Sequence, residues 1–245
     1  MRFLWADVQN CHRSTGVVVV IDVVRAFTTA AYALAAGAGR ILPVETVEDA
    51  LRLREQIPGS LTMGESGGMP VTGFDFWNSP SEVAARGAEL SGRTVIQRTS
   101  AGTQGIVRAA SAEVLFAASL VVAAATARAI QELSPEVVTW VPTGWRAGET
   151  GSGSEDVACA EYISAILQGL QPRPEDYLRW KAARQKSPFP DAPPDLLRRF
   201  HADLECCARV DAFDFAMPVT RRDGLWELRP QWADRADGRP PKNVI

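Results

Sequence analysis

Acidic, basic and hydroxyl side chains follow several short apolar runs of this chain, where they could act together on a ligand. The clearest case is GVVVVIDVVRAFTT, residues 16–29, in which Asp22 ends the apolar run and Arg25 and Thr28 come after it. Carboxylates and hydroxyls in a chain with only two histidines suit a hard cation such as Mg²⁺ better than zinc. Arg25 and Arg98 can pair with a phosphate, sulfonate or carboxylate in bidentate geometry. These residue types favour metal-assisted hydrolysis of a small, multiply anionic phosphate ester.

Three further polar clusters occupy comparable places in the sequence. Glu65 ends the segment SLTMGE, and Glu155 and Asp156 follow a Gly/Ser stretch. The third cluster follows the segment RTVIQR and consists of Thr99, Ser100, Gly102 and Thr103. Residues 66–82 are rich in Gly, Pro, Ser and aromatics and show no periodicity, and a loop of this length in a compact domain is usually functional. Its polar residues are Asp75, Asn78 and Ser79.

We assign roles to these residues as hypotheses. The expected catalytic residues are Asp22, Arg25, Glu65 and Asp75. The expected substrate-binding residues are Thr28, Asn78, Ser79, Arg98, Thr99, Ser100, Gly102 and Thr103. The expected ligands of Mg²⁺ are Asp22, Glu65, Glu155 and Asp156.

Each cluster also has a purely structural interpretation, which stays open at this point. Asp22 could serve only as the cap of the following helix. Residues 99–103 could form a plain strand-to-helix turn, and they are not a Walker P-loop, because no Gly-Lys-Ser/Thr is present. Two adjacent acids at 155 and 156 suit the first turn of any helix through its dipole.

The elements that would position these side chains alternate between strands and helices. Residues 17–21 are four valines and an isoleucine, a run too short for a helix core and typical of a strand buried on both faces. The alanine-rich segment after them predicts a helix ended by Gly37. The same alternation recurs as far as residue 170 and predicts a largely parallel sheet with right-handed crossovers. Because the carboxyl ends of parallel strands share one edge, the polar clusters are expected to converge there.

Composition and charge narrow the class of protein. A chain of 245 residues with 46% hydrophobic and 22% charged residues is typical of a soluble globular protein with one large α/β domain or two small ones. The net charge of −3 argues against nucleic acid as a partner. No run approaches the ~20 apolar residues of a membrane span, and the first ten residues lack the features of a signal peptide. The four cysteines show no metal-binding spacing, which predicts buried thiols and a cytoplasmic location.

The last third of the chain differs in character from the rest. Residues 175–210 predict two helices around the proline-rich break SPFPDAPPD, which we expect to cover the sheet. Residues 211–229 are expected to return as an edge strand or a hairpin, and the final residues to be frayed. We therefore expect a single domain, residues 1–245, with an α/β core at 1–170 and a helical cover and return strand at 171–245. Whether the chain forms a homodimer stays open.

Several segments together resemble the 2-phosphosulfolactate phosphatase (ComB-like) family. They are VVVVIDVVRAFTTAAYALAAGA, GESGGMPVTGFDFWNSPSE, RTSAGTQGI and SGSEDVACA, and the match covers most of residues 16–170. The resemblance implies a three-layer α/β/α sandwich around a mixed sheet. It further implies a Mg²⁺-dependent phosphatase that converts 2-phospho-3-sulfolactate to 3-sulfolactate and phosphate, on the route to coenzyme M.

Two segments depart from the family pattern, and they keep other functions open. Where the family usually reads Thr-Thr-Thr-Asn-Gly-Thr, residues 98–103 read RTSAGT, and the usual Ser-Phe-Leu-Asn is SLVV at 119–122. The alternatives are a phosphatase for a different small phospho-acid and a non-catalytic binder of an anionic metabolite. Within the phosphatase hypothesis, Asp22 either attacks phosphorus itself or holds the metal while water attacks. The missing Asp-x-Asp pattern favours the second role.

Overall fold

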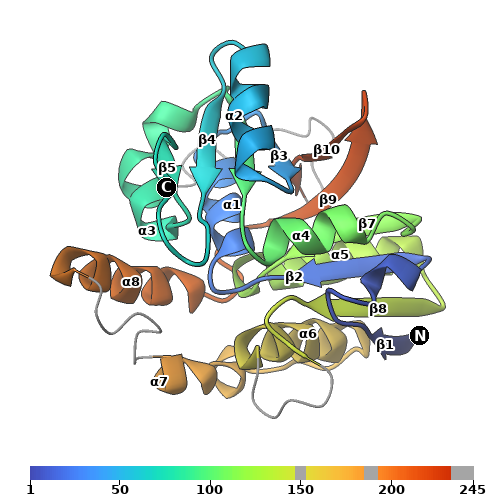
Figure 1. Cartoon of the computed structure of the whole chain (residues 1–245). Coiled ribbons are helices and arrows are strands. Elements are labelled where there is room, and N and C mark those ends of the chain that lie inside the picture. Colours follow the sequence, from blue (N-terminus) through green and yellow to red (C-terminus); the bar gives the residue numbers. More distant parts are fainter. Residues whose placement is uncertain (147–152, 185–192, 233–245) are drawn as a thin grey trace.

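The computed structural model describes residues 1–146, 153–184 and 193–232 and shows one mixed β-sheet between layers of helices (Figure 1). The strands are β1 (Arg2–Trp5), β2 (Val17–Ile21), β3 (Arg40–Val44), β4 (Leu61–Gly64), β5 (Phe76–Trp77), β6 (Thr94–Arg98), β7 (Val114–Ala118), β8 (Val137–Pro142), β9 (Phe215–Arg222), β10 (Leu225–Leu228) and β11 (Gln231–Trp232). The α-helices are α1 (Ala26–Ala35), α2 (Val47–Gln56), α3 (Pro80–Arg86), α4 (Gly102–Arg108), α5 (Ala123–Leu133), α6 (Ser154–Leu167), α7 (Trp180–Arg184) and α8 (Pro194–Cys207).

The sheet consists of two parallel groups joined by an antiparallel hairpin. Its strand order is β1-β8-β2-β7-β9-β10-β3-β6-β4-β5, with β11 paired to β9. The pairs β2–β8, β2–β7, β3–β6 and β4–β6 are parallel, whereas β7–β9, β9–β10 and β10–β3 are antiparallel. This architecture confirms the predicted α/β sandwich with a mixed, largely parallel sheet.

The central strand β2 is buried on both faces, as its run of β-branched residues predicts. Val18 and Val20 face a core shared with α1 and α4. Val17, Val19 and Ile21 face the opposite core, which α5 and α6 cover. Strand β2 therefore holds its last residues rigidly, because both sides of the strand are packed.

Several helix boundaries lie where local sequence signals put them. The Thr46 side chain accepts a hydrogen bond from the backbone N–H of Asp49 and caps α2, and Ser79 does the same for α3 through the N–H of Glu82. Helix α1 is followed by Gly37, whose positive φ of 95° suits glycine. These signals depend only on neighbouring residues, which explains why they can be found in the sequence.

The C-terminal hairpin β9–β10 lies inside the sheet, so the expectation of an edge strand is wrong and that of a hairpin is confirmed. Strand β9 pairs with β7 and β10 with β3, which places the hairpin between the two parallel groups. Phe215, Ala216 and Met217 of β9 are almost fully buried. Their burial on both faces of the sheet favours a central position, since an edge strand would leave part of this apolar surface in water.

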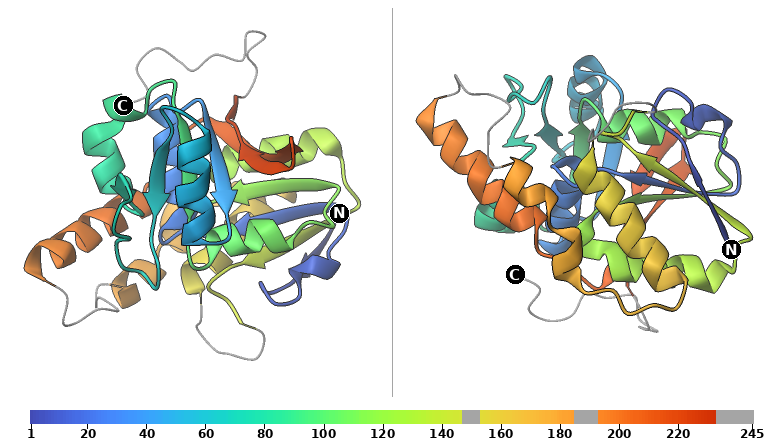
Figure 2. Two further views of the ribbon diagram at one scale, coloured as in Figure 1. Left: turned by 45° about the horizontal axis from the view of Figure 1, so that its top comes forward. Right: turned by 90° about the horizontal axis from the view of Figure 1, so that it is seen from below.

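The predicted helical cover is present as α7 and α8 (orange), which Figure 2 shows beside α6 and α3. Helix α8 packs against α3, and α7 packs against α6. The four cysteines are free thiols, of which Cys11, Cys159 and Cys207 are buried as expected and Cys206 is half-buried. No helix in the described part of the chain is long and apolar enough to cross a membrane.

Candidate active site

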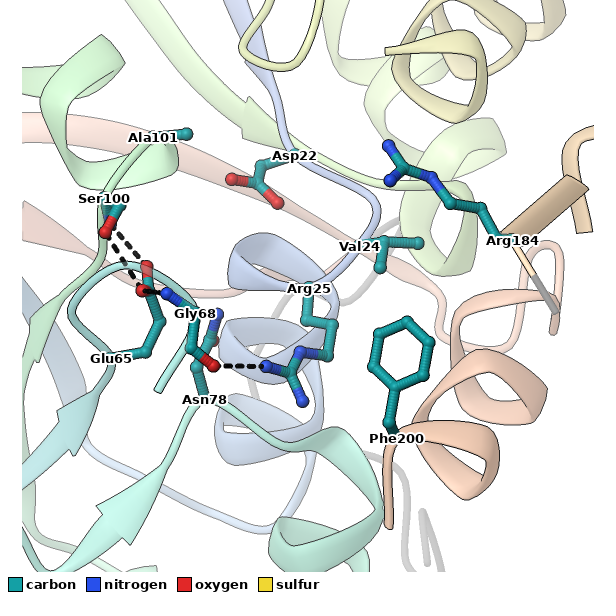
Figure 3. A pocket seen from close by; sticks show the side chains of 10 residues that line it. All are labelled: Asp22, Val24, Arg25, Glu65, Gly68, Asn78, Ser100, Ala101, Arg184 and Phe200. Carbon is teal, nitrogen blue, oxygen red and sulfur yellow. Dashed lines mark hydrogen bonds between the residues drawn. The ribbon is translucent and has the colours of Figure 1, made fainter. Parts of the chain in front are cut away.

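A cavity of about 170 Å³ lies at the carboxyl ends of β2, β4 and β6 (Figure 3). Its lining comes from the loops after these strands, from the residue after β5 and from the two covering helices. The lining residues are Asp22, Val24, Arg25, Glu65, Gly68, Asn78, Ser100, Ala101, Arg184 and Phe200. The expected convergence of polar clusters at one sheet edge thus occurs for Asp22, Arg25, Glu65, Asn78 and Ser100.

Asp22 both accepts the first backbone N–H of helix α1, although Arg25 occupies the N-cap position, and lines the cavity, so its structural and functional interpretations hold together. Its Oδ1 accepts a hydrogen bond from the backbone N–H of Ala26 at 2.9 Å, and its Oδ2 accepts one from the Thr143 hydroxyl at 3.1 Å. Burial raises the pKa of Asp22 from 3.8 to about 6, helped by the negative charges of Glu65 and Glu155 and opposed by those two hydrogen bonds. Because burial disfavours the ionised form of Asp22, a positive charge close to this carboxylate would stabilise that form.

Asp156 forms the second half of a buried carboxylate pair. Its Oδ1 accepts a hydrogen bond from the backbone N–H of Val23 at 2.8 Å, and its Oδ2 accepts one from the N–H of Gly144 at 2.9 Å. The Thr143 hydroxyl lies 3.5 Å from Asp156 Oδ2 and so stands between the two acids. Burial, followed by the charges of Asp22 and Glu155, holds the pKa of Asp156 well above its usual range.

Glu65 fastens the loop after β4 to the loop after β6. One carboxylate oxygen accepts the backbone N–H of Ser100, and the other accepts the Ser100 hydroxyl and the N–H of Gly68. The Ser100 hydroxyl in turn accepts the N–H of Gly67 at 2.8 Å. These contacts fix two loops at the cavity with one buried acid.

The side chain of Arg25, the N-cap residue of α1, is held by contacts on several sides. Its Nη1 donates to Asp203 Oδ2 at 2.7 Å, and its guanidinium carbon lies 4.1 Å from the centre of the Trp77 ring. Its Nη2 makes a long contact of 3.4 Å with the carbonyl oxygen of Gly68. Such a planar cation is suited to a phosphate or carboxylate oxygen.

Asn78 presents a buried acceptor with no partner. The residue is 4% exposed and lines the cavity, and its Oδ1 accepts no hydrogen bond from the described residues. A buried polar atom without a partner costs free energy on the order of 1–3 kcal/mol. A ligand that offers a proton or a positive charge would remove that cost.

Arg184 brings a second guanidinium group to the cavity from α7. Its Nε donates to Glu155 Oε2 at 3.2 Å, and its Nη2 also bonds Glu155. Glu155 is buried, whereas Arg184 is 36% exposed. The acid therefore holds Arg184 at the cavity, where Asp22, Arg25 and Arg184 are drawn at three separate points of the lining (Figure 3).

Other predicted site residues have structural partners outside the cavity lining. Asp75, which directly precedes β5, pairs with Arg54 of α2 at 2.8 Å and accepts the backbone N–H of Thr62. Thr28 donates its hydroxyl to the carbonyl of Val23. Ser79 donates to Asp203, Arg98 donates to the backbone oxygen of Glu65, and Thr99 and Thr103 bond each other's backbone N–H groups.

The four carboxylates expected to bind metal do not gather around one point. Within the described ranges, no group of three or more His, Cys, Asp or Glu residues lies close enough to hold an ion. Asp156 is turned to backbone N–H groups and Glu155 to Arg184, so only Asp22 and Glu65 of the four line the cavity. The oxygen-bearing residues that line the cavity are instead Asp22, Glu65, Ser100 and Asn78, whose buried Oδ1 has no partner among the described residues. This donor set suits Mg²⁺, which takes one or two carboxylates and completes its shell with water and phosphate oxygens.

Gly102 has a packing role that its lack of a side chain explains. A Cβ there would lie 2.7 Å from the Ala26 Cβ and 2.9 Å from Asp22 Oδ2. We expect Gly102→Ala to lower the free energy of unfolding by about 1–3 kcal/mol through overpacking and to lower turnover by displacing Asp22. Gly87→Ala is the matched control, because its Cβ would meet Ala36 at 2.8 Å, away from the cavity. Equal losses of turnover in both variants at equal stability would contradict the role of Gly102 beside Asp22.

Among the residues of this site that sequence reasoning missed, four make side-chain contacts of note: Thr143, Arg184, Phe200 and Asp203. Thr143 follows an apolar strand and could have been found by the same rule as Asp22. Phe200, Asp203, Leu204 and Cys207 lie on one buried face of α8, so an acid on an otherwise apolar helix face is a signal for Asp203. Arg184 lies in a generally charged segment, and no pattern distinguishes it.

The fold and the cavity together define a class of enzyme. An α/β sandwich with carboxylates, a helix cap and guanidinium groups at the carboxyl edge of its sheet is suited to hydrolysing small anionic esters. A profile of the 2-phosphosulpholactate phosphatase family matches residues 5–222. The chain belongs to this family of phosphoric monoester hydrolases.

Curated relatives carry the same name. A probable 2-phosphosulfolactate phosphatase of Carboxydothermus hydrogenoformans is 37% identical over 212 residues, which are 80% of this chain and 83% of that protein. The similarly named protein of Bacillus subtilis is 33% identical over 84% of this chain and 87% of its own. That of Thermus thermophilus is 36% identical over 84% of this chain and 88% of its own.

Proposed function

We propose that this protein hydrolyses the phosphate monoester of a small acid, with 2-phospho-3-sulfolactate as its substrate and Mg²⁺ as its cofactor. The observation that carries the proposal is the cavity that Asp22, Arg25 and Arg184 line together (Figure 3). The family membership and the names of the relatives support the substrate. The coenzyme M pathway and a cytoplasmic location remain predictions that rest on the family resemblance and the composition.

The charge of the site supports a divalent cation. Each guanidinium group is balanced by a carboxylate behind it, Arg25 by Asp203 and Arg184 by Glu155. Among the described residues, Asp22 and Glu65 have no ion pair to balance them, so the lining is negative when both are ionised. A phosphate ester would be repelled by such a lining until a cation enters.

Asp22 and the Oδ1 of Asn78 are the residues that would hold Mg²⁺, with Glu65 as the other carboxylate on the lining. When bound, the ion supplies Lewis-acid polarisation of the phosphoryl group. Arg25 contributes a fixed planar cation for phosphate oxygens, and Glu65 keeps the two loops in place. We propose attack by water rather than by Asp22, because residue 24 is Val and the Asp-x-Asp pattern is absent.

Arg184 supports a substrate with an acidic group besides its phosphate. It lies across the cavity from Arg25, and a volume of about 170 Å³ admits only a small molecule. Two cations at separate points of one cavity lining can bind two anionic groups of one substrate at once. A sulfonate or carboxylate close to the phosphate, as in a phosphorylated three-carbon acid, has this arrangement.

The test is phosphate release from 2-phospho-3-sulfolactate, phosphoglycolate and p-nitrophenyl phosphate. We expect wild-type protein to prefer an ester with a second acidic group, and Arg184→Gln to lose ~10–100-fold in kcat/KM on such an ester while changing little on p-nitrophenyl phosphate. Arg173→Gln is the control, since Arg173 is exposed and pairs with Asp176 at the surface. No phosphate release from any of these esters, in the presence of Mg²⁺, would refute the proposed function.

A further inference from the structure

Asp203 is a carboxylate in the middle of α8 that has no exposure to solvent. Its Oδ2 accepts Arg25 Nη1 at 2.7 Å. Its Oδ1 accepts the hydroxyls of Ser79 at 2.7 Å and Ser81 at 2.6 Å, and the backbone N–H of Ser81 at 3.1 Å. One buried acid of the covering helix is therefore joined to the beginnings of both α1 and α3.

This carboxylate determines how the Arg25 guanidinium group is oriented. Asp203 occupies Nη1, while the rings of Trp77 and Phe200 lie 4.1 and 5.6 Å from the guanidinium carbon. Nη2 has only its 3.4 Å contact with Gly68, and no hydrogen bond joins Nε to another described residue. The N–H groups left over belong to a side chain that lines the cavity, so the cation is fixed before a ligand arrives.

A purely structural ion pair would not need this arrangement. Burying two charges costs several kcal/mol per ion, and the pair often adds no net stability over apolar residues of the same size. Here the acid is surrounded by four donors, and its cation stays at the wall of a cavity instead of being enclosed. A role in holding Arg25 in place for a ligand would explain why the protein bears the free-energy cost of burying this ion pair.

We propose that Asp203 is a positioning residue of the active site, which fixes Arg25 so that its free N–H groups bind the phosphoryl oxygens of the substrate. This assignment rests on the proposed phosphatase function. It gives the helical cover a part in substrate binding, since removal of the Asp203 charge would leave Arg25 free to turn away from the cavity.

The experiment is a double-mutant cycle of Asp203→Asn and Arg25→Lys, with kcat and KM for p-nitrophenyl phosphate and the affinity for inorganic phosphate as measurements. We expect Asp203→Asn to raise KM and the phosphate dissociation constant ~10–100-fold while kcat changes less than about fivefold. In the Arg25→Lys background, Asp203→Asn should alter KM and the phosphate dissociation constant by less than about threefold, because the effects of residues that act through one another are not additive. Equal effects in both backgrounds would overturn the assignment and leave Asp203 a structural residue.

Glu205→Gln is the matched control on the same helix, because Glu205 is 67% exposed and pairs with Lys181. Glu205→Gln should leave kcat, KM and the phosphate dissociation constant unchanged. If Asp203→Asn does not fold, as judged by near-ultraviolet circular dichroism, Ser81→Ala takes its place and should give a smaller rise in KM that also disappears in the Arg25→Lys background. A rise that persists there would overturn the assignment.

Phosphate binding separates failure of this inference from failure of the proposed function. Wild-type protein that binds phosphate but hydrolyses no ester would refute the phosphatase, yet weaker binding in Asp203→Asn alone would still support the positioning role. Wild-type protein that neither hydrolyses esters nor binds phosphate would overturn both.

Discussion

Asp22→Asn should lower turnover by about 10³-fold or more, because an amide cannot supply the negative oxygen that the site offers to a cation and to the reaction. The fold should remain intact, since the side-chain oxygen of Asn can still accept the N–H of Ala26. Turnover and the thermal midpoint are to be measured on the same preparation. Near-wild-type turnover would leave Asp22 only the structural role of accepting the N–H of Ala26.

Stability offers a second readout for the same variant. Burial raises the pKa of Asp22 from 3.8 to about 6, so the folded protein favours the protonated form and ionised Asp22 costs stability above that pH. In metal-free buffer at pH 8 the neutral amide should therefore raise the free energy of unfolding, by up to about 3 kcal/mol. The gain should shrink as the pH falls from 6 toward 4, where Asp22 itself becomes protonated. A lower thermal midpoint at pH 8 would contradict this account of the buried acid.

Asp75→Asn is the informative comparison for Asp22→Asn. Sequence reasoning put both acids among the catalytic residues, but Asp75 is 21% exposed and pairs with Arg54. We expect less than about a tenfold loss of turnover from Asp75→Asn, the scale of a lost surface contact rather than of a reacting group.

To separate attack by water from attack by Asp22, wild-type enzyme with radiolabelled substrate is quenched in acid. Trapped label would show an aspartyl-phosphate and refute attack by water.

Removal of metal is expected to have the other large effect. A chelator should abolish phosphate release, and Mg²⁺ or Mn²⁺ should restore it, because Asp22 and Glu65 line the cavity without an ion pair in the described part of the chain and hard cations prefer such oxygens. Full turnover in a verified metal-free preparation would refute the Mg²⁺ requirement.

Binding of the ion can also be followed without activity. A ligand present at 100 times its dissociation constant stabilises the folded state by about 2.7 kcal/mol, so Mg²⁺ should raise the thermal midpoint of the wild type. The rise should be absent in Asp22→Asn and reduced in Asn78→Ala, which removes the unpaired Oδ1. It should persist in Asp75→Asn. A rise of the same size in all these variants would place the ion elsewhere.

The sequence by itself determined the features that depend on neighbouring residues. The run of valines predicts β2, the alanines predict α1, and Ser79 predicts the beginning of α3. Because strand and helix alternate, it also predicts that residues after β2, β4 and β6 meet at one edge. That argument brought Asp22, Glu65 and Ser100 together correctly without a structure.

Only the tertiary structure decided which of the polar residues face the cavity. Asp75 and Asn78 belong to one loop, but the two-residue strand β5 lies between them, and one contacts Arg54 while the other lines the cavity. Glu155 and Asp156 are adjacent, yet one meets Arg184 of α7 and the other the backbone after β2. The direction of a side chain at a strand or helix end depends on packing, which a one-dimensional pattern does not contain.

Only the tertiary structure decided how the last third of the chain contributes to the sheet and to the site. The hairpin β9–β10 joins the two halves of the sheet, and Asp203 reaches Arg25 across 178 positions of sequence. Local propensity predicts that a segment forms a strand or a helix, but it does not predict which other segment that element packs against. Such contacts depend on burial and on charges of residues that are far apart in the chain. An acid on the apolar face of α8 finds its cation only when that helix packs over the beginning of α1.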